Sequence, residues 1–222
     1  MSSAPALQST TVAHVLVGAH ALEGELMIPS PAKGVVVFAH GSGSSRTSPR
    51  NRRVAHVLHG HELATLLFDL LDDAEAADRA NVFDVDLLAG RVVEALDWLA
   101  DQPGLERMRV GLFGASTGAA AALVAATQRP WQVCALVSRG GRPDLAGDAL
   151  ARVTTPTLLI VGARDPEVLR LNRRAMLALG CEKRLEVVPG ASHLFEEPGT
   201  LDAAAQLAGS WFAHRLSNGI DR

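Results

Sequence analysis

The chain contains no tyrosine and only two cysteines among its 222 residues. Cys134 and Cys181 cannot build a disulfide framework, and Cys134 lies in an apolar run that is typical of a buried strand. No apolar run approaches the roughly 20 residues that a membrane-spanning helix needs. The segment from Met1 to Thr11 lacks the basic start and apolar stretch of a signal peptide. We therefore expect a cytoplasmic protein, since few cysteines suit a reducing compartment.

Neither sign of charge dominates the sequence. It has 21 lysines and arginines against 24 aspartates and glutamates, a formal net charge of −3. This balance gives no broad electrostatic reason to bind nucleic acid or an anionic membrane, and we expect neither as a partner. Hydrophobic residues make up 48%, as in ordinary globular proteins. The length predicts one domain over residues 1–222.

Strand and helix signals alternate along most of the chain. An antiparallel pair is expected over residues 12–17 and 22–28. The alternation that follows predicts an α/β fold: a mostly parallel sheet of seven to eight strands with helices on both faces. Sites in such sheets form at the carboxyl ends of the strands. Further strands are predicted over residues 35–39, 64–68, 110–113, 133–138, 157–161 and 185–188, and helices over residues 51–60, 85–99, 118–126, 144–151, 167–178 and 201–216.

A glycine-flanked serine follows the strand predicted at residues 110–113. Gly114-Ala115-Ser116-Thr117-Gly118 has the pattern G-x-S-x-G between a strand and a helix. This setting raises the serine hydroxyl at the N-terminus of a helix, where negative charge is favoured, and glycine on either side permits the tight turn. The pattern predicts Ser116 as a nucleophile. The alternative is a serine that only caps the helix.

An acid and a histidine follow two later strands. Asp165 comes after the strand at residues 157–161 and His193 after the strand at residues 185–188. Alone, Asp165 could be a helix cap before Pro166, and His193 an ordinary surface-loop residue. The chain order Ser116, Asp165, His193 is that of α/β-hydrolases, and all three follow strands. We therefore predict a nucleophile, an orienting acid and a general base.

A glycine- and serine-rich loop, His40-Gly41-Ser42-Gly43, follows the strand at residues 35–39. Acyl transfer needs backbone N–H donors for the oxyanion. The residue after the nucleophile, Thr117, and a residue of this early loop are the usual sources. We predict Ser42 with Thr117, and Gly43 as the alternative to Ser42. A merely flexible turn is the other interpretation, and His40 is expected to hydrogen-bond beneath the loop.

Four sequence runs that carry these residues resemble the α/β-hydrolase superfamily. They are VVVFAHGSGSS, GLFGASTGAAAAL, TLLIVGARD and GASHLFEE. Together with the compact size, they are similar to the dienelactone-hydrolase-like group of small bacterial hydrolases. The resemblance implies the α/β-hydrolase fold, a cytoplasmic location and no large lid domain. The better-known dienelactone hydrolases use a cysteine nucleophile, whereas this chain has Ser116, so dienelactone itself does not follow as the substrate.

The expected activity is hydrolysis of small or medium carboxylic esters through an acyl-enzyme on Ser116. Only residues 139–156 occupy the place where lipases often insert a lid, so an open pocket is expected and long-chain lipids are not. A thioesterase, amidase, lactonase or acyltransferase would use the same three residues. A non-catalytic binding protein on this fold is the remaining alternative. The partner is then a small acyl substrate, with no cofactor or metal, and nothing predicts the oligomeric state.

Arginines gather near two of the strand ends. Arg46 and Arg53 belong to the loop after the oxyanion turn, and Arg139 and Arg142 follow the strand at residues 133–138. Arginine binds carboxylates in a bidentate way, so Arg46, Arg53 and Arg139 are candidates for an anionic group of the substrate. Solvated charges, or ion pairs with Asp69, Asp72 or Asp144, are the alternative.

Overall fold

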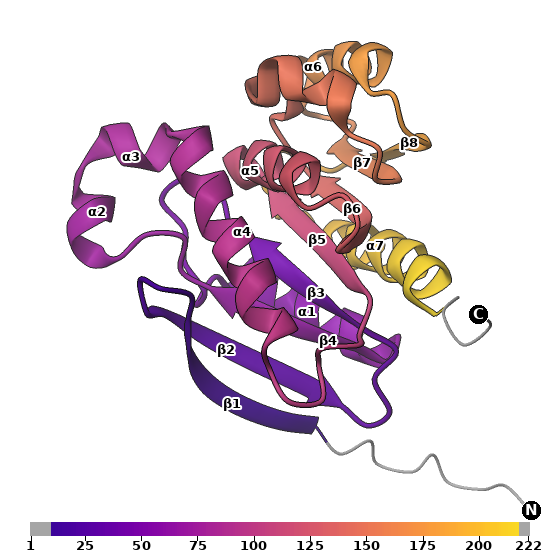
Figure 1. Ribbon diagram of the computed structural model, residues 1–222. Coiled ribbons are helices and arrows are strands. Elements are labelled where there is room, and N and C mark those ends of the chain that lie inside the picture. The colour runs from indigo at the N-terminus through magenta and orange to yellow at the C-terminus, as the bar shows by residue number, and fades with distance from the viewer. Residues whose placement is uncertain (1–9, 218–222) are drawn as a thin grey trace, which may run out of the picture.

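The computed structural model describes residues 10–217 (Figure 1). Residues 1–9 and 218–222 lie outside the described part, although the single-domain prediction over residues 1–222 and the expectation for Met1 to Thr11 include them. The single domain therefore stays a prediction. Within residues 10–217, no helix has the length and apolar character needed to cross a membrane.

The described residues build one eight-stranded sheet in the order β1-β2-β4-β3-β5-β6-β7-β8. The first two strands pair antiparallel, β2 is antiparallel to β4, and β3 to β8 are parallel. The predicted mostly parallel sheet is confirmed. The strands are β1 (Thr10–Val17), β2 (Leu22–Pro29), β3 (Gly34–Ala39), β4 (Leu63–Phe68), β5 (Val110–Ala115), β6 (Val133–Arg139), β7 (Thr157–Gly162) and β8 (Lys183–Val188).

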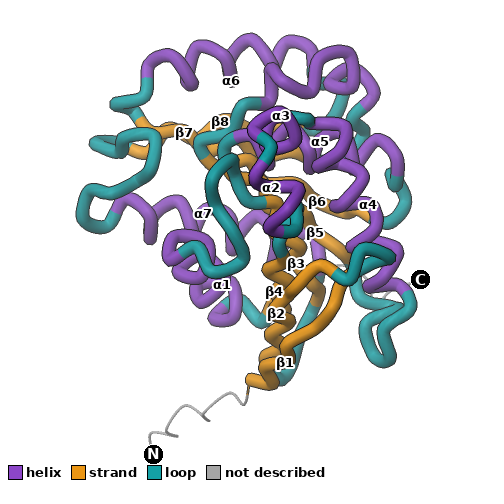
Figure 2. Tube along the Cα trace, turned by 90° about the vertical axis from the view of Figure 1, so that its left-hand side faces the viewer, coloured by secondary structure: helices purple, strands orange, loops and turns teal. Residues whose placement is uncertain are grey.

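Helices cover both faces of this sheet (Figure 2). One face packs against α1 (Pro49–Gly60) and α7 (Thr200–Leu216), and the other against α4 (Val85–Ala100), α5 (Thr117–Gln128) and α6 (Pro166–Ala178). Every residue of β3, β4, β5 and β7 is buried. This is why these strands appear in the sequence as nearly continuous apolar runs rather than as alternating ones, although β4 contains Thr65 and β7 begins with Thr157.

The connection from β4 to α4 contains two short helices that the sequence patterns did not indicate. They are α2 (Asp73–Ala77) and α3 (Arg79–Phe83), and neither contains a buried residue. Their starts are capped by the side chains of Asp72 and Asp78. Helices of one turn that bury nothing have no apolar periodicity, so the patterns could not reveal them.

The segment where a lid was considered holds only a short element. Instead of the helix predicted over residues 144–151, Pro143–Arg152 (η1) forms a 3₁₀ helix that is interrupted at Gly147, where φ is +52°. This segment has no room for a lid domain, in agreement with the sequence. The expectation of an open pocket stays a prediction, and two short helices, α2 and α3, lie beside the loops at the carboxyl ends of the strands (Figure 1).

The sheet topology creates a crevice where the predicted site residues lie. Strands β3 and β5 are neighbours, but the helices that follow them, α1 and α5, cover opposite faces. The loops after these two strands therefore diverge, which is the arrangement that opens a crevice in α/β sheets. The loops after β7 and β8 end at the same edge of the sheet.

Candidate active site

Ser116 occupies a strained turn between β5 and α5. Its backbone has φ +51° and ψ −122°, a conformation that costs a non-glycine residue about 1–3 kcal/mol. A Cβ atom on Gly114 would lie 2.4 Å from the Ala119 Cα, and one on Gly118 would lie 2.2 Å from the Ala39 carbonyl oxygen. Both contacts are with backbone, so the turn requires glycine at these positions.

The Ser116 hydroxyl does not cap α5. Ser116 is the N-cap residue, but its side chain makes no capping hydrogen bond. The interpretation of Ser116 as a mere capping residue is therefore wrong. Its N–H donates to the Arg139 carbonyl oxygen over 3.4 Å, which joins the turn to the end of β6.

Asp165 and His193 form a direct pair. The Nδ1 of His193 lies 2.6 Å from the Asp165 Oδ2, and the Asp165 side chain is only 13% exposed. Because an ionised carboxylate only accepts hydrogen bonds, this contact assigns the proton to Nδ1 and leaves Nε2 able to accept one. The other Asp165 oxygen, Oδ1, accepts the Val168 N–H over 3.4 Å and caps α6. Asp165 is therefore also the helix cap that the sequence offered as an alternative.

Gly140, the residue that follows β6, lies close to the histidine, and its neighbour contacts the serine. A Cβ atom on Gly140 would lie 3.0 Å from the His193 carbonyl oxygen and 3.7 Å from its Nδ1. The preceding residue, Arg139, accepts the Ser116 N–H. The Ser116 Oγ and the His193 Nε2 are not hydrogen-bonded in this structure. Catalytic hydrogen bonds are often long in free enzymes and shorten when substrate binds.

Glu197 holds the histidine loop, a role that sequence reasoning missed. Its Oε2 accepts the Ser192 N–H over 2.9 Å and the Ser192 hydroxyl over 3.2 Å. Its Oε1 lies 3.5 Å from the Arg164 guanidinium. One carboxylate thus joins the residue before His193 to the residue before Asp165. The Ser192 N–H, as the main cause, holds the pKa of Glu197 below its usual range. In the sequence, the only sign of this role is that Glu197 follows His193 by four residues.

The loop after β3 differs from the prediction in one detail. The Ser42 N–H donates to the Thr117 Oγ1 over 2.9 Å, so it is already engaged. In the described residues, the N–H groups of Thr117 and Gly43 have no acceptor. The sequence assigned Ser42 and Thr117 as oxyanion donors. The structure favours Thr117 with Gly43, the alternative to Ser42, because those two N–H groups are available.

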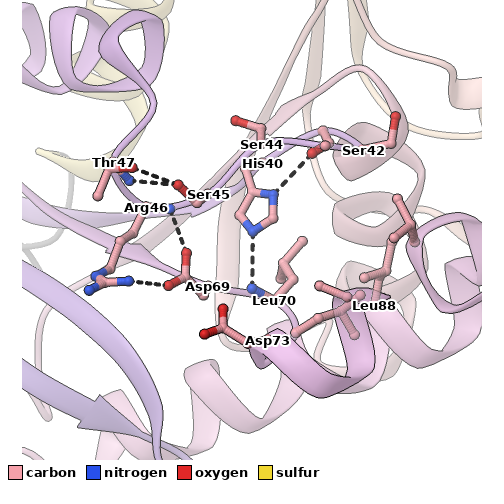
Figure 3. A pocket seen from close by; sticks show the side chains of 15 residues that line it. His40, Ser42, Ser44, Ser45, Arg46, Thr47, Asp69, Leu70, Asp73 and Leu88 are labelled. Atoms are coloured by element: carbon pink, nitrogen blue, oxygen red, sulfur yellow. Dashed lines mark hydrogen bonds and ion pairs between the residues drawn. The ribbon is translucent and has the colours of Figure 1, made fainter. Parts of the chain in front are cut away.

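His40 supports this loop from below, as expected (Figure 3). Its Nε2 lies 3.0 Å from the Leu70 backbone nitrogen, which can only donate, so Nε2 accepts. The Nδ1 then carries the proton and donates to the Gly41 carbonyl oxygen over 3.0 Å. Burial lowers the pKa of His40 below its usual value, in keeping with a neutral imidazole.

Carboxylates neutralise two of the three candidate arginines. Arg46 pairs with Asp69 and Glu23, and Arg53 lies 2.7 Å from Asp202 on α7. The Arg46–Asp69 pair is the alternative that the sequence left open, so we no longer assign Arg46 or Arg53 to a substrate.

Arg139 is different, because no acidic side chain of the described residues pairs with it. It is 7% exposed, its Nε and Nη1 have no hydrogen-bond partner, and its guanidinium lies 5.7 Å from the centre of the Phe195 ring. Burial lowers the pKa of Arg139 to about 10. Of the three candidates, only Arg139 keeps a charge that an anion could neutralise.

With this geometry established, comparison with known proteins identifies the class. The model of the dienelactone hydrolase family matches residues 23–213. The chain therefore belongs to the dienelactone hydrolase family and has the α/β-hydrolase fold. A crystal structure of a dienelactone hydrolase from Anabaena variabilis is 55% identical, with a TM-score of 0.88, and the match covers 94% of this chain and 98% of that one.

Other relatives are less direct. A Mycobacterium tuberculosis (strain H37Rv) protein named "Putative phosphoribosyl transferase Rv0571c" is 58% identical over 202 residues, covering 91% of this chain and 46% of that protein. The chain thus spans about half the length of this curated relative. Est1E from Butyrivibrio proteoclasticus is 12% identical with a TM-score of 0.76 over 93% of this chain and 99% of Est1E, and it shows the fold alone.

Proposed function

We propose that this hydrolase-family chain hydrolyses small or medium carboxylic esters through an acyl-enzyme on Ser116. The observation that carries the proposal is the 2.6 Å pair of Asp165 and His193, together with a strained serine whose hydroxyl caps nothing. Strain in a non-glycine residue persists only where the surroundings enforce it, and it concentrates at functional sites.

The proposed chemistry follows from the proton positions. His193 Nε2 accepts the Ser116 proton while Oγ attacks the ester carbonyl carbon, and Asp165 stabilises the imidazolium that forms. The Thr117 and Gly43 N–H groups stabilise the tetrahedral oxyanion. His193 then gives its proton to the leaving alcohol oxygen as the bond to the carbonyl carbon breaks. Water, deprotonated by His193, hydrolyses the acyl-enzyme and restores Ser116.

Other acyl substrates use the same steps. Thioesters, amides, lactones and transfer to an acceptor other than water remain alternatives, since each proceeds through the same acyl-enzyme. A non-catalytic binding protein is the alternative of a different class. The phosphoribosyl transferase name belongs to a relative of which the chain covers 46%, and we do not transfer it.

The test is covalent labelling. The purified protein and its Ser116→Ala variant are treated with a fluorophosphonate and weighed intact by mass spectrometry. We expect one adduct on the parent and none on the variant, followed by ester turnover in the parent only. A folded parent that forms no adduct would contradict the serine mechanism and favour the binding protein. An adduct without ester turnover, but with turnover of a thioester or amide, would change the substrate class.

A further inference from the structure

A cavity of about 390 Å³ lies beside the oxyanion loop, on the side of β4 (Figure 3). The loop after β3 forms one wall, the start of the connection after β4 forms another, and side chains of α2, α3 and α4 close it. The apolar side chains that line it are Leu70, Leu71, Ala76, Val82 and Leu88. The short helices that the sequence patterns missed therefore provide part of this wall.

The direction of the proposed reaction indicates which part of an ester enters this cavity. His193 must protonate the leaving oxygen, so the leaving group lies on the His193 side of Ser116. His193 packs against Gly140 at the end of β6. Gly41 contacts Ser116 from the opposite side, because a Cβ atom on Gly41 would lie 3.0 Å from the Ser116 Cβ. Across the sheet, the order is thus cavity, Ser116, His193. The acyl group is the part that points away from the histidine.

The charges around the cavity exclude one class of acyl group. Arg46 lines it, but its guanidinium turns to Asp69 and also pairs with Glu23 (Figure 3). Asp73, on the first residue of α2, lines the same cavity without an ion-pair partner among the described residues. These four side chains leave an excess of negative charge, so a second carboxylate on the acyl group would be repelled.

On the basis of the proposed function, we infer that this cavity is the acyl pocket, that it accepts an uncharged apolar acyl group, and that Ala76 and Val82 of the α2–α3 connection limit its length. The anionic subsite considered for the arginines is therefore absent from this pocket. Each methylene that enters an apolar pocket raises kcat/KM about fourfold, equivalent to about 0.8 kcal/mol.

The length limit is tested with p-nitrophenyl esters of acetate, butyrate, hexanoate and octanoate. The parent is compared with Ala76→Phe and with the matched control Ala77→Phe, which changes the next residue of α2, an exposed residue that does not line the cavity. We expect kcat/KM to rise from acetate to hexanoate in the parent. Ala76→Phe should lower hexanoate activity relative to acetate by roughly tenfold, and the control should not. Val82→Phe is the second filling variant, and thermal denaturation checks that each variant is folded.

Three outcomes would overturn the inference. Ala76→Phe and Val82→Phe could leave the chain-length profile unchanged, or Ala77→Phe could shift it equally. Alternatively, the filling variants could change selectivity among acetate esters of different alcohols, which would make the cavity a leaving-group pocket. Failure of the proposed function looks different, because the parent would then form no fluorophosphonate adduct.

The preference for an uncharged acyl group is measured separately. The parent is compared on the p-nitrophenyl esters of pentanoate and of monoanionic glutarate, which differ by one carboxylate. The parent should have a higher kcat/KM for the pentanoate ester than for the glutarate ester. Asp73→Asn should raise kcat/KM for the glutarate ester, relative to the pentanoate ester, about threefold at low salt. Asp86→Asn, an acidic residue in the first turn of α4 that does not line the cavity, is the matched control. A higher kcat/KM of the parent for the glutarate ester would contradict the inference that the cavity accepts an uncharged acyl group.

Discussion

Replacing Asp165 with asparagine should separate two roles that one carboxylate performs. Its Oδ1 accepts the Val168 N–H and caps α6, while its Oδ2 lies 2.6 Å from the His193 Nδ1. Asparagine is as good an N-cap as aspartate, so its carbonyl oxygen can keep the bond to Val168. The amide nitrogen then faces Nδ1, and because it only donates, it favours the histidine tautomer with the proton on Nε2.

That tautomer cannot accept the serine proton. In a serine-protease triad, the corresponding substitution lowers kcat about 10⁴-fold while the geometry stays intact, and we expect a loss of about that size for Asp165→Asn. The melting temperature of Asp165→Asn should stay close to that of the parent. Asp165→Ala should lose similar activity and also the cap, about 1 kcal/mol, which lowers the melting temperature of a domain of this size by about 2–4 °C.

The assay pairs ester hydrolysis with thermal unfolding for the parent, Asp165→Asn and Asp165→Ala. Activity of Asp165→Asn within about tenfold of the parent would contradict a catalytic role, because Asp165 would then be only a cap. An equal loss of stability in both variants would contradict the capping role assigned to asparagine.

Three further predictions concern residues around the site. Glu197→Gln weakens the bonds that hold Ser192, and kcat should fall by up to about 10²-fold if the histidine loop shifts by roughly 1 Å. Unchanged kinetics would show that Glu197 does not position His193. For His40, burial lowers the pKa in the folded state, so the unfolded chain binds its proton first as pH falls below 6.5. Stability should therefore decrease from that pH downwards. His40→Gln should lose this part of the dependence in urea titrations at several pH values, and an identical slope would contradict it. Arg139→Met removes a buried charge without an acid partner, so the melting temperature should stay equal or rise. A large drop would point to an unrecognised partner, and selective loss of activity on esters with anionic leaving groups would support substrate binding by Arg139.

The sequence predicts the fold well because burial on both faces leaves a strong pattern. Strands such as β3 and, after Thr157, β7 are continuous apolar runs, and helices such as α1 and α4 bury one side. Elements that bury nothing leave no such pattern. The helices α2 and α3 are held by aspartate caps and by polar contacts of Glu75 with Arg91 and Asn81, and the break in η1 depends on one glycine, Gly147.

The candidate site is predictable where the backbone restricts the residue type. Gly114 and Gly118 are required by contacts with backbone atoms that a Cβ would overlap. Their spacing marks Ser116, and strand-end placement marks Asp165 and His193. Hydrogen bonds between side chain and main chain cannot be predicted in this way. The engagement of the Ser42 N–H by Thr117, and of Ser192 by Glu197, depends on distances that no spacing rule contains.

The same contrast separates the proposed nucleophile from the residues that would determine substrate preference. Ser116 lies where only a few backbone geometries are possible, so its neighbours are restricted and recognisable. Ala76 and Val82 line the cavity from helices that bury nothing, and many residues could occupy these positions without unfolding the chain. Substitutions there change the shape of the pocket at little cost in stability. Substrate preference in this chain should therefore vary most easily through the α2–α3 connection, while the loops after β5, β7 and β8 hold the three proposed catalytic residues.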